Sequence, residues 1–151
     1  MDYIQKISLR MVKEDLVDYN GNKLKSVKVS SPDVIFDLMH LIGLHESPEE
    51  KFIVLCLDTK NNISDFFVVS HGSVNASIVH PRDVFKRALL SNSTSILLIH
   101  NHPTGNTKPS KNDKKRTQRL VDGGEILGIN VLDHLIIGDY NYYSFKENNL
   151  L

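Results

Sequence analysis

The sequence is poor in cysteine and has no long apolar run. Cys56 is the single cysteine among 151 residues, so no disulfide can form within the chain, which favours a reducing, cytoplasmic setting. Cys56 lies in an apolar run, where a small buried residue is expected rather than a catalytic thiol. No stretch approaches the ~18 apolar residues of a membrane helix, and residues 1–5 lack the pattern of a secretory signal. The composition predicts a cytoplasmic protein without a membrane span.

The chain also lacks an excess of charge of either sign. Its 18 basic residues balance 18 acidic residues, so the formal net charge is +0. This balance removes any argument from overall charge for binding to nucleic acid or to a membrane surface. The hydrophobic fraction of 40% is ordinary for a globular protein. The length corresponds to one domain with a substantial core.

Helical and strand patterns alternate along the chain. From residue 31 onward, apolar spacing and turn residues predict helices at residues 31–43, 81–90 and 110–127, and strands at residues 52–58, 63–70, 95–99, 131–137 and 142–145. Earlier residues predict a strand at residues 7–11, a hairpin turn at Asn20 and Gly21, and a returning strand at residues 24–29. We therefore expect a hairpin-like extension at residues 1–30 and a layered α/β domain at residues 31–151, with helices flanking a mixed sheet.

Two histidines continue the predicted strand at residues 95–99. Side chains two positions apart on a strand point to the same side, so His100 and His102 can converge on one point. Pro103 and Gly105 then end the strand. Two imidazoles are thus presented together where the strand meets a turn.

A helix start follows this strand end closely. Seven residues separate His102 from Ser110, which opens the predicted helix, and Asp113 lies in the first turn. Two His and one Asp can supply three ligands of a tetrahedral zinc site, whose fourth position stays open for water as in catalytic sites. The pattern marks His100, His102 and Asp113 as candidate zinc ligands.

Each part of this pattern also has a simpler interpretation. Ser110 and Asp113 form the Ser-x-x-Asp pattern of a helix cap, and two histidines in a turn can form local hydrogen bonds. The combined spacing, with Pro and Gly where the strand must end, favours a metal site. The tripeptide His-Asn-His does not indicate an HNH nuclease, because that name describes residues dispersed over a longer unit.

The spacing resembles the zinc-binding JAMM motif of the JAB/MPN metalloproteases, and the surrounding sequence resembles the RadC-like branch of that family. The segments that carry this resemblance, besides the one at His100, are residues 52–61, 72–85 and 128–138. The resemblance implies the JAB/MPN fold, a sheet flanked by helices with a topology related to that of cytidine deaminases. It also implies Zn²⁺ as cofactor and cleavage of a peptide or isopeptide bond in a peptide or protein substrate.

The resemblance assigns roles to individual residues. The zinc ligands fall on His100, His102 and Asp113, the general base on Glu50, and the donor to the oxyanion on Ser110. Strand parity supports Glu50 over Glu49, because Glu50 shares one side of an extended strand with Phe52. The alternative is that both acids are solvated residues of a Ser-Pro-Glu-Glu turn.

Asp133 and His134 are further candidates in a predicted strand. An adjacent strand can bring either residue behind a ligand imidazole and orient it. The alternative, which the sequence leaves equally open, is that one of them lies on the surface.

The helix after the motif is rich in basic residues. They are Lys108, Lys111, Lys114, Lys115, Arg116 and Arg119. We expect a solvated helix face that points mostly away from the metal. The alternative is a positive field that favours an acidic substrate.

Three functions compete at this stage. A zinc metallopeptidase comes first, and a DNA-repair or other nucleic-acid-associated role of the RadC type comes second, supported by the basic helix alone. A zinc deaminase comes last, because that chemistry uses His-x-Glu and Pro-Cys-x-x-Cys, whereas Cys56 stands elsewhere in the chain.

Overall fold

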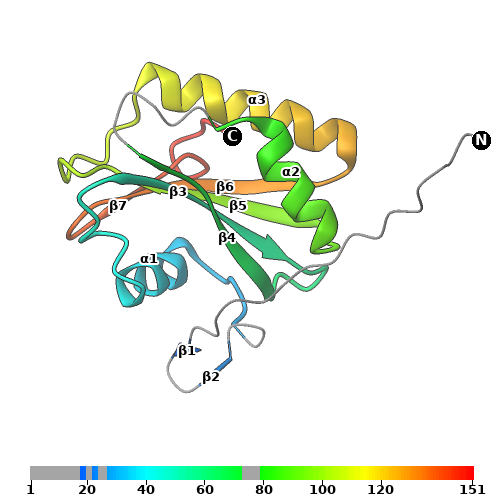
Figure 1. Cartoon of the computed structure of the whole chain (residues 1–151), viewed down its shortest axis with the longest axis horizontal. Helices are drawn as coiled ribbons and strands as arrows, with labels where there is room; N and C mark the ends of the chain where they lie inside the picture. Colours follow the sequence, from blue (N-terminus) through cyan, green and yellow to red (C-terminus); the bar gives the residue numbers. More distant parts are fainter. Residues whose placement is uncertain (1–17, 20–21, 24–26, 73–78) are drawn as a thin grey trace, which may run out of the picture.

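A five-stranded mixed sheet forms the centre of the molecule (Figure 1). The computed structural model describes residues 18–19, 22–23, 27–72 and 79–151. The sheet has the order β4-β3-β5-β6-β7, with β3 (Glu50–Leu57), β4 (Ile63–Gly72), β5 (Ser95–Asn101), β6 (Asn130–Ile137) and β7 (Tyr142–Ser144). β5 and β6 are parallel and the other neighbours antiparallel. A parallel pair needs a long crossover, which α3 (Lys111–Leu127) supplies.

Helices cover both faces of this sheet. α1 (Pro32–Leu41) lies on one face, and α2 (Pro81–Leu90) and α3 lie on the other (Figure 1). Successive strand residues point to opposite faces, so β3 divides its apolar side chains between two cores. Ile53, Leu55 and Leu57 join the core under α1, and Phe52, Val54 and Cys56 join the core under α2 and α3. The predicted layered α/β fold with a mixed sheet is confirmed.

The segment before α1 differs from its prediction. β1 (Asp18–Tyr19) pairs antiparallel with β2 (Asn22–Lys23), so a hairpin closes around the predicted turn, although Asn20, Gly21 and the predicted strand at residues 7–11 lie outside the described residues. The described strand that pairs with β1 is β2, and residues 24–26 of the predicted returning strand lie outside the described residues. Within the described residues 27–29, Lys28 forms an isolated bridge with Asn62, because this segment bonds to the turn between β3 and β4. The boundary at residue 30 stays a prediction.

Helix ends follow the signals in the sequence. His80 caps α2, and its Nδ1 accepts a hydrogen bond from the Arg82 amide at 3.2 Å. α3 ends before Gly128, whose φ of 69° lies in the left-handed region that glycine adopts without strain. The chain then enters β6 within two residues, which sets the register of β6 beside β5.

No membrane-crossing helix is found among the described residues. Their helices lack the combination of length and apolar character that a bilayer span requires.

Candidate metal centre

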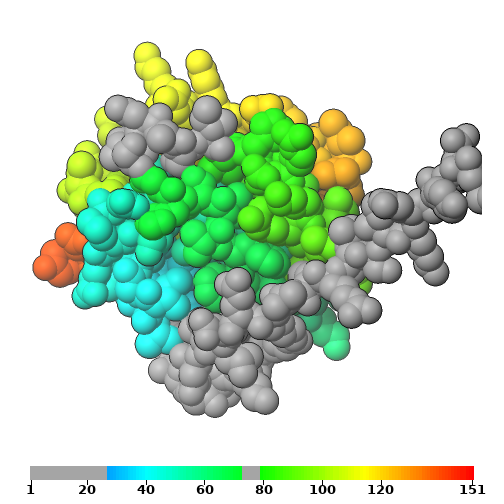
Figure 2. Space-filling view, viewed as in Figure 1, coloured from blue at the N-terminus to red at the C-terminus, as the bar shows by residue number. Residues whose placement is uncertain are grey.

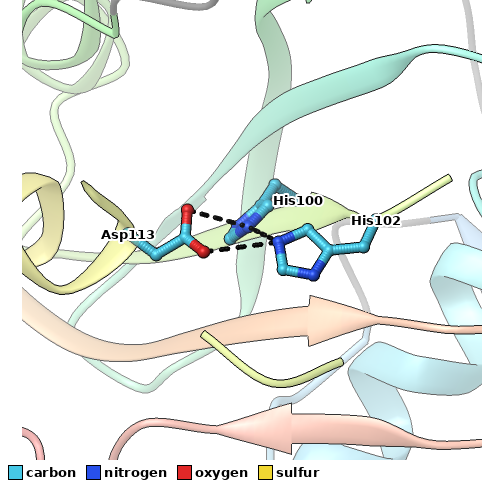
Figure 3. Close-up of side chains that lie close together, drawn as sticks. All are labelled: His100, His102 and Asp113. Atoms are coloured by element: carbon cyan, nitrogen blue, oxygen red, sulfur yellow. Dashed lines mark hydrogen bonds and ion pairs between the residues drawn. The ribbon is translucent and has the colours of Figure 1, made fainter. Parts of the chain in front are cut away.

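Three side chains converge at the carboxyl end of β5 (Figure 3). His100 lies in β5, His102 follows it, and Asp113 lies in the first turn of α3. His100 Nε2 lies 3.0 Å from His102 Nε2 and 3.4 Å from Asp113 Oδ1, and His102 Nε2 lies 3.3 Å from Asp113 Oδ2. The fold thus brings together the three residues that the sequence marked, and the group could hold a metal ion. Their role as ligands stays a prediction.

The spacing of these atoms fits a tetrahedral metal. Zinc bonds to nitrogen and oxygen ligands measure about 2.0–2.1 Å, so two ligand atoms of a tetrahedron lie about 3.3 Å apart. The separations of 3.0, 3.3 and 3.4 Å bracket that value. Neither His100 nor Asp113 has to leave the buried interior to meet an ion, so the site is preformed.

Local hydrogen bonds hold two of the three side chains. Ser110 Oγ accepts from the Asp113 amide at 3.0 Å, and Asp113 Oδ2 accepts from the Ser110 amide at 2.7 Å. His102 Nδ1 donates to the Asn106 carbonyl at 2.6 Å. The cap and the turn of the simpler interpretation therefore exist. They do not compete with a metal site, because they hold the Asp113 carboxylate and the His102 ring in the orientation that faces the site.

A directed chain of hydrogen bonds lies behind His100. The Thr117 hydroxyl donates to the Asp113 carbonyl at 2.7 Å, so Thr117 Oγ1 can only accept from His134 Nδ1, at 2.6 Å. A neutral His134 then accepts at Nε2, and His100 Nδ1 must donate to it at 2.8 Å. Burial keeps His134 neutral, because it holds the pKa of that imidazole well below its usual value. The chain therefore fixes the tautomer of His100.

These bonds leave three acceptors facing one another. Because Nδ1 is the donor in both His100 and His102, a neutral ring presents its Nε2 lone pair to the cluster. The Asp113 carboxylate supplies the third acceptor. Lone pairs and a carboxylate at this range repel unless a cation lies between them. The cluster is thus built for a proton or a metal ion.

Electrostatics favour His102 over His100 as the site of that proton. Burial lowers the pKa of His100 despite its hydrogen bond with Asp113. Burial would also lower the pKa of His102, but hydrogen bonds with Asp113 and the Asn106 carbonyl outweigh it and raise that pKa. The two imidazoles likewise outweigh burial at Asp113 and lower its pKa. A proton on His102 and a metal ion would therefore compete for the same lone pair.

Asp133 and His134 are both inside the molecule. Their exposed fractions are 4% and 0%, so the alternative that one lies on the surface is wrong. His134 contacts His100 directly, whereas Asp133 accepts hydrogen bonds from the His134 amide at 2.7 Å and the Ser144 hydroxyl at 2.5 Å. Asp133 thus fixes the main chain that carries His134.

Glu50 is the first residue of β3. It therefore belongs to the strand, and not to the solvated Ser-Pro-Glu-Glu turn that was the alternative. It is 5% exposed and pairs with Gly72 of β4. Phe52, on the same side of β3, packs in the core under α2 and α3. The neighbouring Glu49 is exposed and forms an ion pair with His71 at 2.7 Å. Of the two acids, Glu50 shares the face of His100, and its role as base stays a prediction.

Arg116 is a site residue whose inward position sequence reasoning missed. Five of the six basic residues are exposed as expected, and side chains from the start of α3, in yellow, project from the molecule in Figure 2. Arg116 instead turns inward, with 16% of its side chain exposed, and its Nη1 lies 3.6 Å from Glu50 Oε1. Its guanidinium lies 5.5 Å from the ring centroid of Phe52. The signal was its spacing of three from Asp113, which places both on one helix face.

The deaminase pattern has no counterpart in the described residues. Cys56 is fully buried near the far end of β3, and burial raises the pKa of its thiol. The metal-binding group found among the described residues contains only His and Asp side chains.

Removing the Thr117 hydroxyl should weaken metal binding. Thr117→Val keeps the volume but removes the acceptor for His134 Nδ1, which frees the rings of His134 and His100 to turn. Loss of a partner behind a ligand typically costs about 10–100-fold in metal affinity. Competition with a chelator measures this effect, and Thr117→Ser, which keeps the hydroxyl, should retain most of the affinity. Equal metal affinity in the Val and Ser variants would show that the hydrogen bonds from His100 through His134 to Thr117 do not contribute to metal binding.

Comparison with known proteins extends over most of the chain. Residues 29–150 match the family model of the RadC-like JAB domain. A UPF0758 protein of Methanosarcina barkeri is 52% identical over 124 residues, which cover 82% of this chain and 54% of the relative. A UPF0758 protein of Pelobacter propionicus is 46% identical over 134 residues, covering 88% and 58% respectively. The chain thus spans about half the length of the curated relatives it matches.

Proposed function

Because the chain belongs to the family of RadC-like JAB domains, we propose that it is a zinc-dependent metallopeptidase that cleaves a peptide or isopeptide bond. The observation that carries this proposal is the meeting of two imidazole lone pairs and one carboxylate, each held by a hydrogen bond to a neighbouring group. Imidazole ligands suit zinc, and three protein ligands leave one position for water, as in catalytic zinc sites. His100, His102 and Asp113 would hold the ion.

The residues around the ligands have the chemistry that hydrolysis needs. A zinc ion held by these side chains would supply an acidified water and polarise the scissile carbonyl. Glu50 accepts a proton from the attacking water and passes it to the leaving amine. The Ser110 oxygen already accepts from the Asp113 amide, so its own hydrogen is free to donate to the carbonyl oxygen as negative charge develops there.

Elemental analysis and a cleavage assay test the proposal together. The purified protein is analysed for metal and then incubated with a library of quenched fluorescent peptides, first as isolated, then after chelation and after return of zinc. The proposal expects about one zinc per chain and cleavage that stops on chelation and resumes with zinc. Cleavage by the fully metal-free protein, or failure to bind zinc, would refute it.

The exposed basic residues of α3 should not affect turnover. Lys114, Lys115 and Arg119 point into solvent, so replacing all three with Gln should leave kcat/KM unchanged at every ionic strength. A steering role for an acidic substrate or nucleic acid would instead lower kcat/KM mainly at low salt, where screening is weak. A salt series on the wild-type and triple-variant proteins measures the difference, and a large low-salt defect would reopen the nucleic-acid alternative.

A further inference from the structure

Asn101 separates the two histidines and points to the other face of the sheet. In β5, Leu97 and Ile99 pack in the core under α1, and strand alternation continues that face to Asn101. The side chain is 1% exposed. A polar amide at this depth needs hydrogen-bond partners.

Those partners lie on both sides of Glu50. Asn101 Oδ1 accepts from the Lys51 amide at 2.8 Å. Asn101 Nδ2 donates to the Glu49 carbonyl at 3.1 Å and to the Ser47 carbonyl at 3.4 Å. The amide orientation is unambiguous, because carbonyls only accept and the main-chain N–H only donates. One side chain therefore holds the main chain before and after the predicted base.

These bonds begin where the pairing of β3 with β5 ends. The last pair of the ladder is Phe52 with His100, and the same register, if continued, would place Glu50 opposite His102. Beyond this pair, a side-chain hydrogen bond replaces the main-chain ladder. Asn101 joins the Lys51 amide to the end of β5, next to both histidines. On the side of β5, Asn101 thereby fixes the main chain around the predicted base relative to the ligands, while β4 pairs with it on the other side.

The carboxylate of Glu50 has little else to hold it. Within the described part of the chain, its polar contact is the Arg116 ion pair at 3.6 Å, which is longer than a hydrogen bond. The position of the carboxylate must therefore follow from its main chain, which Asn101 joins to β5 and which pairs with β4 on the other side.

We propose that Asn101 is a positioning residue for Glu50, which aligns the base with the metal-binding group. The inference rests on the proposed function, since it takes Glu50 as the base. It goes further because it assigns a role to the central residue of His-Asn-His, whose side chain lies on the opposite face from the reaction. A purely structural residue would affect stability alone, and this difference can be measured.

Cobalt(II) provides the probe, because its visible absorption reports the surroundings of the bound ion without any substrate. The proteins compared are wild type, Glu50→Gln, Asn101→Ala and the double variant, all loaded with one cobalt per chain. Asn101→Gln keeps an amide but displaces it by one methylene, and so gives a second variant that can satisfy the buried carbonyls. Asn62→Ala is the control, because it removes a side-chain hydrogen bond to Asp58 at the far end of β3.

We expect both Asn101 variants to bind cobalt and to shift the spectrum in the direction of Glu50→Gln. The double variant should add nothing to Glu50→Gln, because residues that act through one another are not additive. With a peptide that the wild type cleaves, kcat should fall by about 10–100-fold, with KM unchanged, since small misplacements of catalytic groups have effects of this size. Asn62→Ala should alter only the unfolding temperature.

The two ideas fail in different ways. A shifted spectrum in Glu50→Gln, with wild-type spectra and turnover in both Asn101 variants, would overturn the positioning role and leave the metallopeptidase proposal intact. Wild-type spectrum and turnover in Glu50→Gln itself would overturn the base role, and the positioning role with it. Asn101 variants that do not fold while Asn62→Ala does would make Asn101 a structural residue and overturn the inference.

Discussion

His102→Ala should lose most of the bound metal. The substitution removes one of three ligand atoms from a cluster whose separations of 3.0–3.4 Å already match a tetrahedron. Loss of a partner behind a ligand costs about 10–100-fold in affinity, so direct loss of a ligand should exceed about 100-fold. Zinc per chain after dialysis against a weak chelator should fall from about one to near zero.

His71→Ala is the matched control for this change. It removes an imidazole of the same kind, but one that is exposed on β4 and pairs with Glu49. Its zinc content should equal that of the wild type. Unchanged, stoichiometric zinc in His102→Ala would falsify the ligand set.

Glu50→Gln should keep the metal and the fold but abolish hydrolysis. The amide is nearly isosteric with the carboxylate, yet it cannot accept a proton from water at neutral pH. Positioned general bases contribute about 10²–10⁴-fold to rate, so kcat should fall by at least this amount. Zinc content and unfolding temperature should stay close to those of the wild type, because Glu50 is not among the three grouped metal-binding side chains.

Glu49→Gln tests the choice between adjacent acids. Half of the Glu49 side chain is exposed, and it faces His71, so this variant should turn over like the wild type. Full activity in Glu50→Gln together with lost activity in Glu49→Gln would reverse the assignment.

The convergence of the three candidate ligands could be predicted because its determinants are local. Strand parity brings His100 and His102 to one side, and a helix cap places Asp113 at the neighbouring helix start. All three lie within fourteen residues of sequence. The same locality explains why the main helices and strands were found, since their boundaries depend on nearby caps and turns.

The sequence offered Asp133 and His134 as residues behind a ligand imidazole but left a surface position equally open, because the choice depends on strand register. His134 reaches His100 only through the parallel alignment of β6 with β5, and Asn101 reaches residues 47–51 only through the antiparallel alignment of β3 with β5. Neither alignment is encoded in local spacing. Of the strand predicted at residues 24–29, the described residues 27–29 bond to the distant turn between β3 and β4, which local spacing does not encode either.

The hydrogen bonds from His100 through His134 and Thr117 end on the main-chain carbonyl of Asp113, so they form an open series with one direction that links two of the candidate ligands. His134 and Thr117 each pass one hydrogen forward and receive one from behind, so neither can be exchanged for a group of the opposite donor character without leaving its neighbours unpaired. Tolerance to substitution is therefore a property of the series as a whole. A single replacement at Thr117 or His134 is expected to be tolerated only where the new side chain keeps the same donor and acceptor roles, as Thr117→Ser does.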